Sequence, residues 1–205
     1  MFKNYLPQQY LKDSKLKIKH NYLKEQFSDY PIIFNKIKKV INNSQFTLGD
    51  EVTNFEKKFN NTVNSKYSIA VGSGTDAIFL SLKALDIGHG DEVITPAFSF
   101  YATVAAIVRT GAKPVFVDIG LDYNINVNLI ENLINKKTKA ILPIHWGGLC
   151  CDVNKINKIA KKYKIKIVYD ACHSINSKYK GKQSASFGDL SCFSFHPLKN
   201  LNIWG

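Results

Sequence analysis

Residues 92–118 read EVITPAFSFYATVAAIVRTGAKPVFVD, and this stretch decides the fold class. A short apolar run rich in β-branched residues, Glu92 to Thr95, precedes a helical stretch from Ser99 to Gly111. A second run of the same kind follows from Pro114 to Asp118. Two strands joined through a helix favour a crossover connection, which makes the strands parallel. The stretch therefore predicts a strand–helix–strand unit with parallel strands.

The same alternation continues on both sides of this unit. Further strands are predicted at 67–71, 140–144, 165–170 and 190–195, and further helices at 75–85, 129–134 and 153–163. Strands that alternate with helices at this period are typical of α/β proteins, in which helices cover both faces of the sheet. We therefore predict an α/β fold, a mostly parallel sheet sandwiched by helices, with ligands bound at the carboxyl ends of the strands.

The N-terminal part has a different pattern. Apolar residues recur at helical spacing from Pro31 to Ile41, and Val52, Phe55 and Phe59 repeat the pattern after a break at Gly49. No internal repeat or Gly/Ser-rich linker divides the rest of the chain. We expect residues 1–45 to form an N-terminal segment with an amphipathic helix, and residues 46–205 to form one main domain.

Composition excludes several classes of protein. The net charge of +12 comes from dispersed lysines with a single arginine, Arg109, which is typical of a solvated surface, so no nucleic acid partner is expected. No apolar run approaches the roughly 20 residues of a membrane-spanning helix, and no secretory leader precedes the fold. Four cysteines lack any CxxC spacing. We expect a cytoplasmic protein with reduced thiols, no metal site and no membrane partner.

The first candidate site is the turn Gly72-Ser73-Gly74-Thr75-Asp76, which opens a predicted helix. Glycines let the backbone approach a phosphate, and a helix N-terminus supplies unpaired N–H donors. The same letters fit the dinucleotide fingerprint G-x-G-x-x-A, so a nicotinamide-dependent oxidoreductase is an alternative. That alternative requires a carboxylate at the end of the second strand, whereas Asp91 and Glu92 lie at its start.

Two further candidates lie near the C-terminal end of the sequence. Asp170 ends a predicted buried strand, where a carboxylate requires a cation, a metal or a protonated heterocycle as partner, unless it caps the next turn. His173 follows it, as a hydrogen-bonding group rather than a metal ligand, because no second cluster of ligands supports a metal. Lys199 follows an apolar strand and a proline turn, surroundings that favour a nucleophilic amine. Most lysines of this chain are expected to be solvated, and without the neighbouring motifs Lys199 would be assigned to that class.

These motifs occur together in one order: GSGTDA, TPAFSFYAT (Thr95 to Thr103), PVFVDI, PIHWGG, YDACHS and SFHPLKNLN. In this the chain resembles the DegT/DnrJ/StrS family of sugar aminotransferases, from about Tyr22 to its last residue. The resemblance implies the large domain of a fold type I transferase that depends on pyridoxal 5'-phosphate (PLP). It also implies transfer of an amino group, usually from glutamate, to a keto group of a nucleotide-linked sugar, in a homodimer.

The resemblance also assigns roles to residues of this sequence. Lys199 matches the lysine that carries the cofactor and moves protons during transfer, and Asp170 matches the carboxylate that keeps the pyridine nitrogen protonated. The remaining cofactor-binding matches are the phosphate turn, a stacking aromatic, a side chain near the phenolic oxygen and a phosphate-binding hydroxyl: Gly74, Thr75, Asp76, Phe100, His173 and Ser194. A sister activity, sugar dehydration, has histidine in place of the lysine, and Lys199 argues against it.

The resemblance further implies that relatives continue well past this lysine. We therefore expect the large domain to be incomplete at its C-terminus and the C-terminal small domain to be absent. A fragment of an active sugar aminotransferase is then one hypothesis. The alternatives are a truncated, inactive member of the family, a binding or regulatory protein with the same fold, and the NAD(P)-dependent oxidoreductase.

Overall fold

The chain divides into two compact units, one up to Ser44 and one from Gln45 onward. The computed structural model describes residues 22–201 and residue 203. In the first unit, α1 (Leu23–Gln26) precedes α2 (Tyr30–Asn42), which has proline in its first turn, where a missing N–H costs nothing. The helix predicted from Pro31 to Ile41 is thus present, while residues 1–21 of the predicted N-terminal segment lie outside the described residues.

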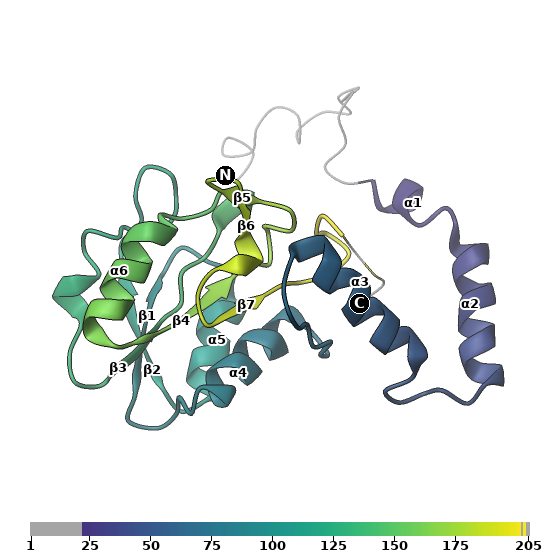
Figure 1. Cartoon of the computed structure of the whole chain (residues 1–205), viewed down its shortest axis with the longest axis horizontal. Helices are drawn as coiled ribbons and strands as arrows, with labels where there is room; N and C mark the ends of the chain where they lie inside the picture. Colours follow the sequence, from purple (N-terminus) through teal and green to yellow (C-terminus); the bar gives the residue numbers. More distant parts are fainter. Residues whose placement is uncertain (1–21, 202, 204–205) are drawn as a thin grey trace, which may run out of the picture. The chain divides into compact units, whose positions relative to one another are not determined.

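The second unit is built on one parallel sheet (Figure 1). Its five strands lie in the order β2-β1-β3-β4-β7, and every neighbouring pair is parallel. The strands are β1 (Glu92–Pro96), β2 (Lys113–Val117), β3 (Thr138–Ile141), β4 (Lys166–Asp170) and β7 (Leu190–Cys192). A short antiparallel hairpin of β5 (Lys178–Tyr179) and β6 (Lys182–Gln183) lies between β4 and β7 in the sequence. The predicted α/β fold with a mostly parallel sheet is confirmed.

Helices cover both faces of this sheet (Figure 1). Helices α4 (Gly74–Ala84) and α5 (Tyr101–Arg109) pack on one face, and α6 (Val153–Tyr163) packs on the other. Successive strand residues point to opposite faces, so Val93 joins the cluster under α4 and α5 while Ile94 joins the cluster under α6. Both are fully buried, and burial of such a side chain stabilises the fold by about 1.5–3 kcal/mol.

Helix α3 (Asp50–Val63) holds the chain that leaves β7. The Phe59 ring meets the rings of Phe193 and Phe195 edge to face, with centroids 5.2 and 5.3 Å apart, and Phe55 meets Phe195 at 5.1 Å. Such aromatic pairs add about 0.5–1.5 kcal/mol each beyond the area they bury. Because Phe193 and Phe195 flank Ser194 and precede Lys199, α3 fixes the segment that carries both candidate residues.

Two predicted elements are wrong. Residues 67–71 form no strand: no described strand pairs with them, Tyr67 is 74% exposed, and the Ala70 N–H donates instead to the Glu56 carboxylate, 2.8 Å away. An apolar run becomes a strand only where a neighbour takes up its backbone hydrogen bonds. The helix predicted at 129–134 is only a 3-10 turn, Glu131–Leu133.

The strand predicted at 190–195 is shorter than expected. β7 ends at Cys192, because the next residues turn toward α3 rather than continue along β4.

One buried polar pair lies inside the core next to β4. His145 and Tyr169 are both fully buried, with ring centroids 4.7 Å apart. The His145 Nδ1 accepts the Cys151 N–H at 3.3 Å, while its Nε2 and the Tyr169 hydroxyl have no partner among the described residues. Burial lowers the pKa of His145 from its ordinary 6.5 to about 4, so the ring is neutral at pH 7.

This buried histidine predicts an acid-sensitive fold. Below pH 6.5 the imidazole of the unfolded chain binds a proton, whereas that of the folded chain binds one only near pH 4. Acid therefore favours the unfolded state. The free energy of unfolding should fall by about 2 kcal/mol between pH 7 and pH 5 on account of His145. His145→Asn, which keeps an acceptor for Cys151, should lose this part of the pH dependence in urea titrations. His89→Asn, at an exposed position, should keep it; identical pH profiles for the wild type and His145→Asn would contradict the prediction.

Candidate active site

Asp170 is the last residue of β4, at the carboxyl edge of the sheet, and only 6% of it is exposed. Its Oδ2 accepts the Thr103 hydroxyl at 2.8 Å, and its Oδ1 accepts the Cys172 N–H at 3.1 Å. Both oxygens therefore receive hydrogen bonds, an arrangement that suits the ionised carboxylate. Both of these donors are neutral, so the buried carboxylate can pair with a cation as well.

Thr103 was not singled out from the sequence. It lies fully buried in the first turns of α5, and its hydroxyl also meets the Ser99 hydroxyl at 2.6 Å. Since the Thr103 proton is used on Asp170, Ser99 is the donor in that second hydrogen bond. The only sequence signal was a hydroxyl residue on the apolar face of a predicted helix.

The turn before α4 lies against the segment that follows β7. A Cβ added at Gly74 would lie 3.0 Å from the Ser194 Cβ and 3.1 Å from the Cys172 Sγ, so this close approach requires glycine. The N–H groups of Gly74 and Thr75 belong to the first turn of the helix, and no partner for them exists in the described part of the chain. Together with the nearby Ser194 hydroxyl they form a cradle for an anion.

Asp76 belongs to the same turn but faces other groups. Its N–H donates to the Ser73 hydroxyl at 3.1 Å, and its carboxylate accepts that hydroxyl at 3.0 Å. The other carboxylate oxygen pairs with Arg109 at 3.1 Å. Asp76 therefore closes the turn and links α4 to α5.

His173 and Lys199 act on each other through space at the same edge. Burial lowers the pKa of His173, the Lys199 charge lowers it further, and the Asp170 charge opposes both. At Cys172, burial and the Asp170 charge raise the pKa of the thiol, while Lys199 opposes the rise. Lys199 is half-buried in the turn after β7, and its backbone N–H donates to the His196 carbonyl at 2.8 Å. The electrostatics thus bring the Lys199 amine, Asp170 and His173 to one place.

Phe100 lies at the N-cap of α5, one turn before Thr103. Its ring is 59% exposed and contacts only its neighbour Tyr101, with centroids 4.5 Å apart, among the described ring contacts. An exposed aromatic ring so near the Asp170 carboxylate is available to stack on a planar ligand.

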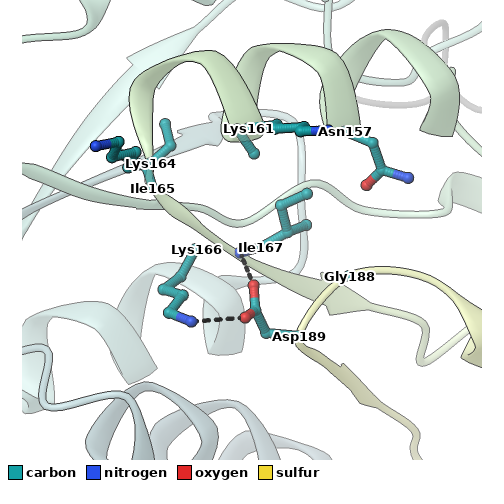
Figure 2. Close-up of a pocket in the computed structure, with 9 residues that line it drawn as sticks. Asn157, Lys161, Lys164, Ile165, Lys166, Ile167, Gly188 and Asp189 are labelled. Atoms are coloured by element: carbon teal, nitrogen blue, oxygen red, sulfur yellow. Dashed lines mark hydrogen bonds and ion pairs between the residues drawn. The ribbon is translucent and has the colours of Figure 1, made fainter.

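A separate hollow lies at the opposite edge of the sheet (Figure 2). It has a volume of about 550 Å³ and is lined by lysines from the end of α6 and by the starts of β4 and β7. The Lys166 ammonium pairs with Asp189 at 2.9 Å, and the Ile167 N–H donates to the same carboxylate. Because ligands of open α/β sheets bind at the carboxyl ends of strands, we do not place the active site in this hollow.

Two features are absent from residues 22–201 and 203. No group of three or more His, Cys, Asp or Glu side chains in this part of the chain is arranged to hold a metal ion. No helix in this part combines the length and the apolar character needed to cross a membrane.

Comparison with known proteins agrees with this geometry. The model of the DegT/DnrJ/EryC1/StrS aminotransferase family matches residues 30–205. The chain belongs to this family. The match covers the Gly74 turn, Asp170 and Lys199, so the family resemblance predicted from the motifs is confirmed.

Two of the curated relatives are named as aminotransferases of nucleotide-linked sugars. A UDP-2-acetamido-2-deoxy-3-oxo-D-glucuronate aminotransferase of Pseudomonas aeruginosa is 43% identical over 170 residues, which are 82% of this chain and 47% of the relative. A dTDP-3-amino-3,6-dideoxy-alpha-D-galactopyranose transaminase of Aneurinibacillus thermoaerophilus is 42% identical over 77% of this chain and 44% of its own length. The chain spans about half the length of the curated relatives it matches.

Solved structures show the same fold. NtdA of Bacillus subtilis, with bound cofactor PMP, superposes with a TM-score of 0.85 at 35% identity over 95% of this chain and 45% of its own. A DegT/DnrJ/EryC1/StrS aminotransferase of Brucella abortus superposes with a TM-score of 0.84 at 34% identity over 92% of this chain and 53% of its own. The fold is that of the PLP-dependent fold type I aminotransferases, and aminotransferases of this family depend on PLP.

Proposed function

We propose that this family member binds PLP through Lys199 and serves the transfer of an amino group, with glutamate as donor, to a keto group of a nucleotide-linked sugar. One observation carries the proposal. A buried carboxylate, a neutral histidine and a lysine amine converge at the carboxyl edge of β4 and β7, beside an anion cradle. None of these three side chains belongs to a hydrophobic cluster of the core.

The described residues fit this cofactor. The N–H groups of Gly74 and Thr75 and the Ser194 hydroxyl would hold its phosphate, while Asp76 would shape the turn rather than touch the anion, because its carboxylate already pairs with Arg109. Asp170 would hold the ring nitrogen, and the exposed ring of Phe100 would cover one face. These assignments keep all the residues predicted from the sequence and change the role of Asp76.

Bound PLP supplies a carbonyl that takes up amino groups and a ring that withdraws electrons. The protein supplies the rest. The Lys199 amine would hold the cofactor and, once released, would move a proton within the site. Asp170 would keep a proton on the ring nitrogen by its negative charge, and the hydrogen bond from the Thr103 hydroxyl would keep the carboxylate in place. His173 is neutral at pH 7 and can donate a hydrogen bond to the phenolic oxygen.

The oxidoreductase alternative finds no support in the described residues. A dinucleotide site would require a carboxylate at the end of β1 to bind a ribose. That strand ends at Pro96, and Glu92 lies at its start.

A homodimer remains a prediction from the family resemblance. It would be tested by measuring the mass of the protein in solution by light scattering.

The proposed function is tested by incubating the protein with PLP, reducing with borohydride and mapping the modified peptide by mass spectrometry. We expect one adduct, on Lys199, although the sequence contains more than two dozen other basic residues. Labelling spread over surface lysines, or none, would contradict the proposal. Release of the cofactor in its amine form after incubation with glutamate, before reduction, would test the amino donor.

Thr103→Val should weaken PLP binding about tenfold. The change removes the hydroxyl that Asp170 accepts while it preserves the shape of the side chain, and a hydrogen bond to a charged group contributes about 1.5–3 kcal/mol. Thr103→Ser keeps the hydroxyl and should bind PLP almost as the wild type does. The measurement is a titration of each variant with PLP, followed by absorbance. Equal affinity of Thr103→Val and Thr103→Ser would show that the hydroxyl does not matter.

A further inference from the structure

Four aromatic side chains line the carboxyl edge of the sheet. Tyr123 follows β2, Phe98 follows β1, Trp146 follows β3 and His173 follows β4, so they appear in the order of the strands across the sheet. The ring centroids are 5.7 Å apart from Tyr123 to Phe98, 4.5 Å from Phe98 to Trp146 and 5.4 Å from Trp146 to His173. We call these four residues the aromatic strip.

The aromatic strip does not belong to the hydrophobic core. Phe98 is 42% exposed and Tyr123 is 57% exposed, and neither belongs to a buried cluster. Contiguous exposed aromatic side chains that meet a catalytic edge usually mark a binding surface. The strip ends at His173, within the electrostatic reach of Lys199, so a ligand on it would extend from the reacting groups.

A buried amide holds the strip in shape. Asn124 is 1% exposed. Its Oδ1 accepts the backbone N–H of Trp146 at 3.0 Å, and its Nδ2 donates to the Leu149 carbonyl at 3.2 Å. It thereby ties the loop after β2 to the loop after β3. Tyr123 itself has a φ of 62°, a left-handed conformation that costs energy for a residue other than glycine. Fixed loops and a strained residue are typical of a preorganised binding surface.

Phe98, the neighbour of Tyr123 in the strip, borders a hollow of about 310 Å³ that is lined by Ala97, Phe98, Val117, Asp118 and Ile119. This volume lies at the lower end of the range for small-ligand sites. Four neighbouring strands extend over roughly 14 Å, room for more than one ring. The Asp118 carboxylate at the hollow would repel a phosphate but can accept N–H or O–H groups of a base or a sugar.

We propose that the aromatic strip is the binding surface for the sugar nucleotide, with the sugar ring against Trp146 beside His173 and the nucleobase against Phe98 and Tyr123 at the hollow. The inference deepens the proposed function and rests on it for the position of the reacting sugar carbon. Stacking explains why the rings are exposed, and the strand order explains why the strip leads to Lys199.

Trp146 can report binding directly. The sequence has two tryptophans, Trp146 and Trp204, so Trp204→Phe leaves Trp146 as the single fluorophore. In that background we expect saturable quenching by UDP-N-acetylglucosamine, with the affinity about tenfold weaker after Phe98→Leu or Tyr123→Leu, since stacking of one base is worth about that factor. Phe116→Leu is the matched control: Phe116 is 50% exposed on β2 and outside the strip, and its replacement should leave the affinity unchanged.

UDP alone should show the same dependence on Phe98, because the base is the part expected there. The proposal is overturned if quenching is not saturable or if Phe98→Leu and Phe116→Leu have the same affinity for UDP-N-acetylglucosamine. It is also overturned if Phe98→Leu leaves the affinity for UDP unchanged. Borohydride labelling of Lys199 in the same variants should be unaffected. Failure of labelling in every variant would reject the proposed function, while the quenching titrations would still decide whether the strip binds sugar nucleotides.

Discussion

Lys199→Ala is expected to abolish the borohydride-stable adduct completely and to eliminate conversion of PLP to its amine form by glutamate. Among residues 22–201 and 203, no other amine is placed at this edge of the sheet beside Asp170, and Asp170 and His173 cannot form the bond to the cofactor. Some PLP should still bind through the Gly74 turn, because the phosphate contacts do not involve Lys199. The measurements are peptide mapping after reduction and absorbance after addition of glutamate.

The control for this experiment is Lys178→Ala, at an exposed position of β5. It removes one positive charge and should leave both readouts unchanged. If Lys199→Ala still formed one specific adduct, the cofactor lysine would have to be sought elsewhere in the chain, and the site built around Asp170 would lose its nucleophile.

Asp170→Asn is expected to have the second largest effect. The substitution preserves the shape of the side chain but removes the charge, and breaking a buried ion pair by removal of one partner costs about 3–5 kcal/mol. The pair expected here is the one between Asp170 and the protonated ring nitrogen of PLP. Since each 1.4 kcal/mol is a factor of ten, its loss should lower the rate at which glutamate converts the cofactor at least about a hundredfold. Stopped-flow absorbance measures this rate, while labelling of Lys199 should persist.

Asp86→Asn provides the matched control, because it makes the same change at an exposed carboxylate. It should leave the conversion rate unchanged. A rate for Asp170→Asn within tenfold of the wild type would mean that the carboxylate serves the fold and not the cofactor. Comparison of thermal stability in the two variants separates these possibilities.

Local patterns predicted the elements that are buried on both faces. The central residues of β1 and β4 are apolar and buried because helices cover the sheet from both sides, so the burial of these strands could be inferred from their composition. The run at 67–71 has the same composition and forms no strand, because strand formation depends on a pairing partner that a local pattern does not contain.

The residues of the candidate site could be singled out where an ionisable side chain occurs next to a buried, apolar element. The position of Asp170 at the end of a buried strand and of Lys199 after an aromatic run made both residues candidates, and the neighbouring motifs then favoured a functional role over a structural or solvated one. Thr103 and Phe59 were not singled out, since a threonine in an apolar helix and a phenylalanine on an amphipathic one are ordinary. Their importance arises from contacts with Asp170 and Phe195, which lie 67 and more than 130 positions further along the chain.

The strand order has a kinetic consequence. Every strand of the five-stranded sheet pairs in parallel with a partner that the chain reaches through a crossover, and contacts so distant in sequence slow the search for the native state. β7 is the last of the described strands, and its pairing with β4 sets Cys192 opposite Asp170, seven positions before Lys199. The proposed capture of PLP would thus arise only after β7 has docked on β4. In refolding experiments, the rate of capture would report the docking of this strand.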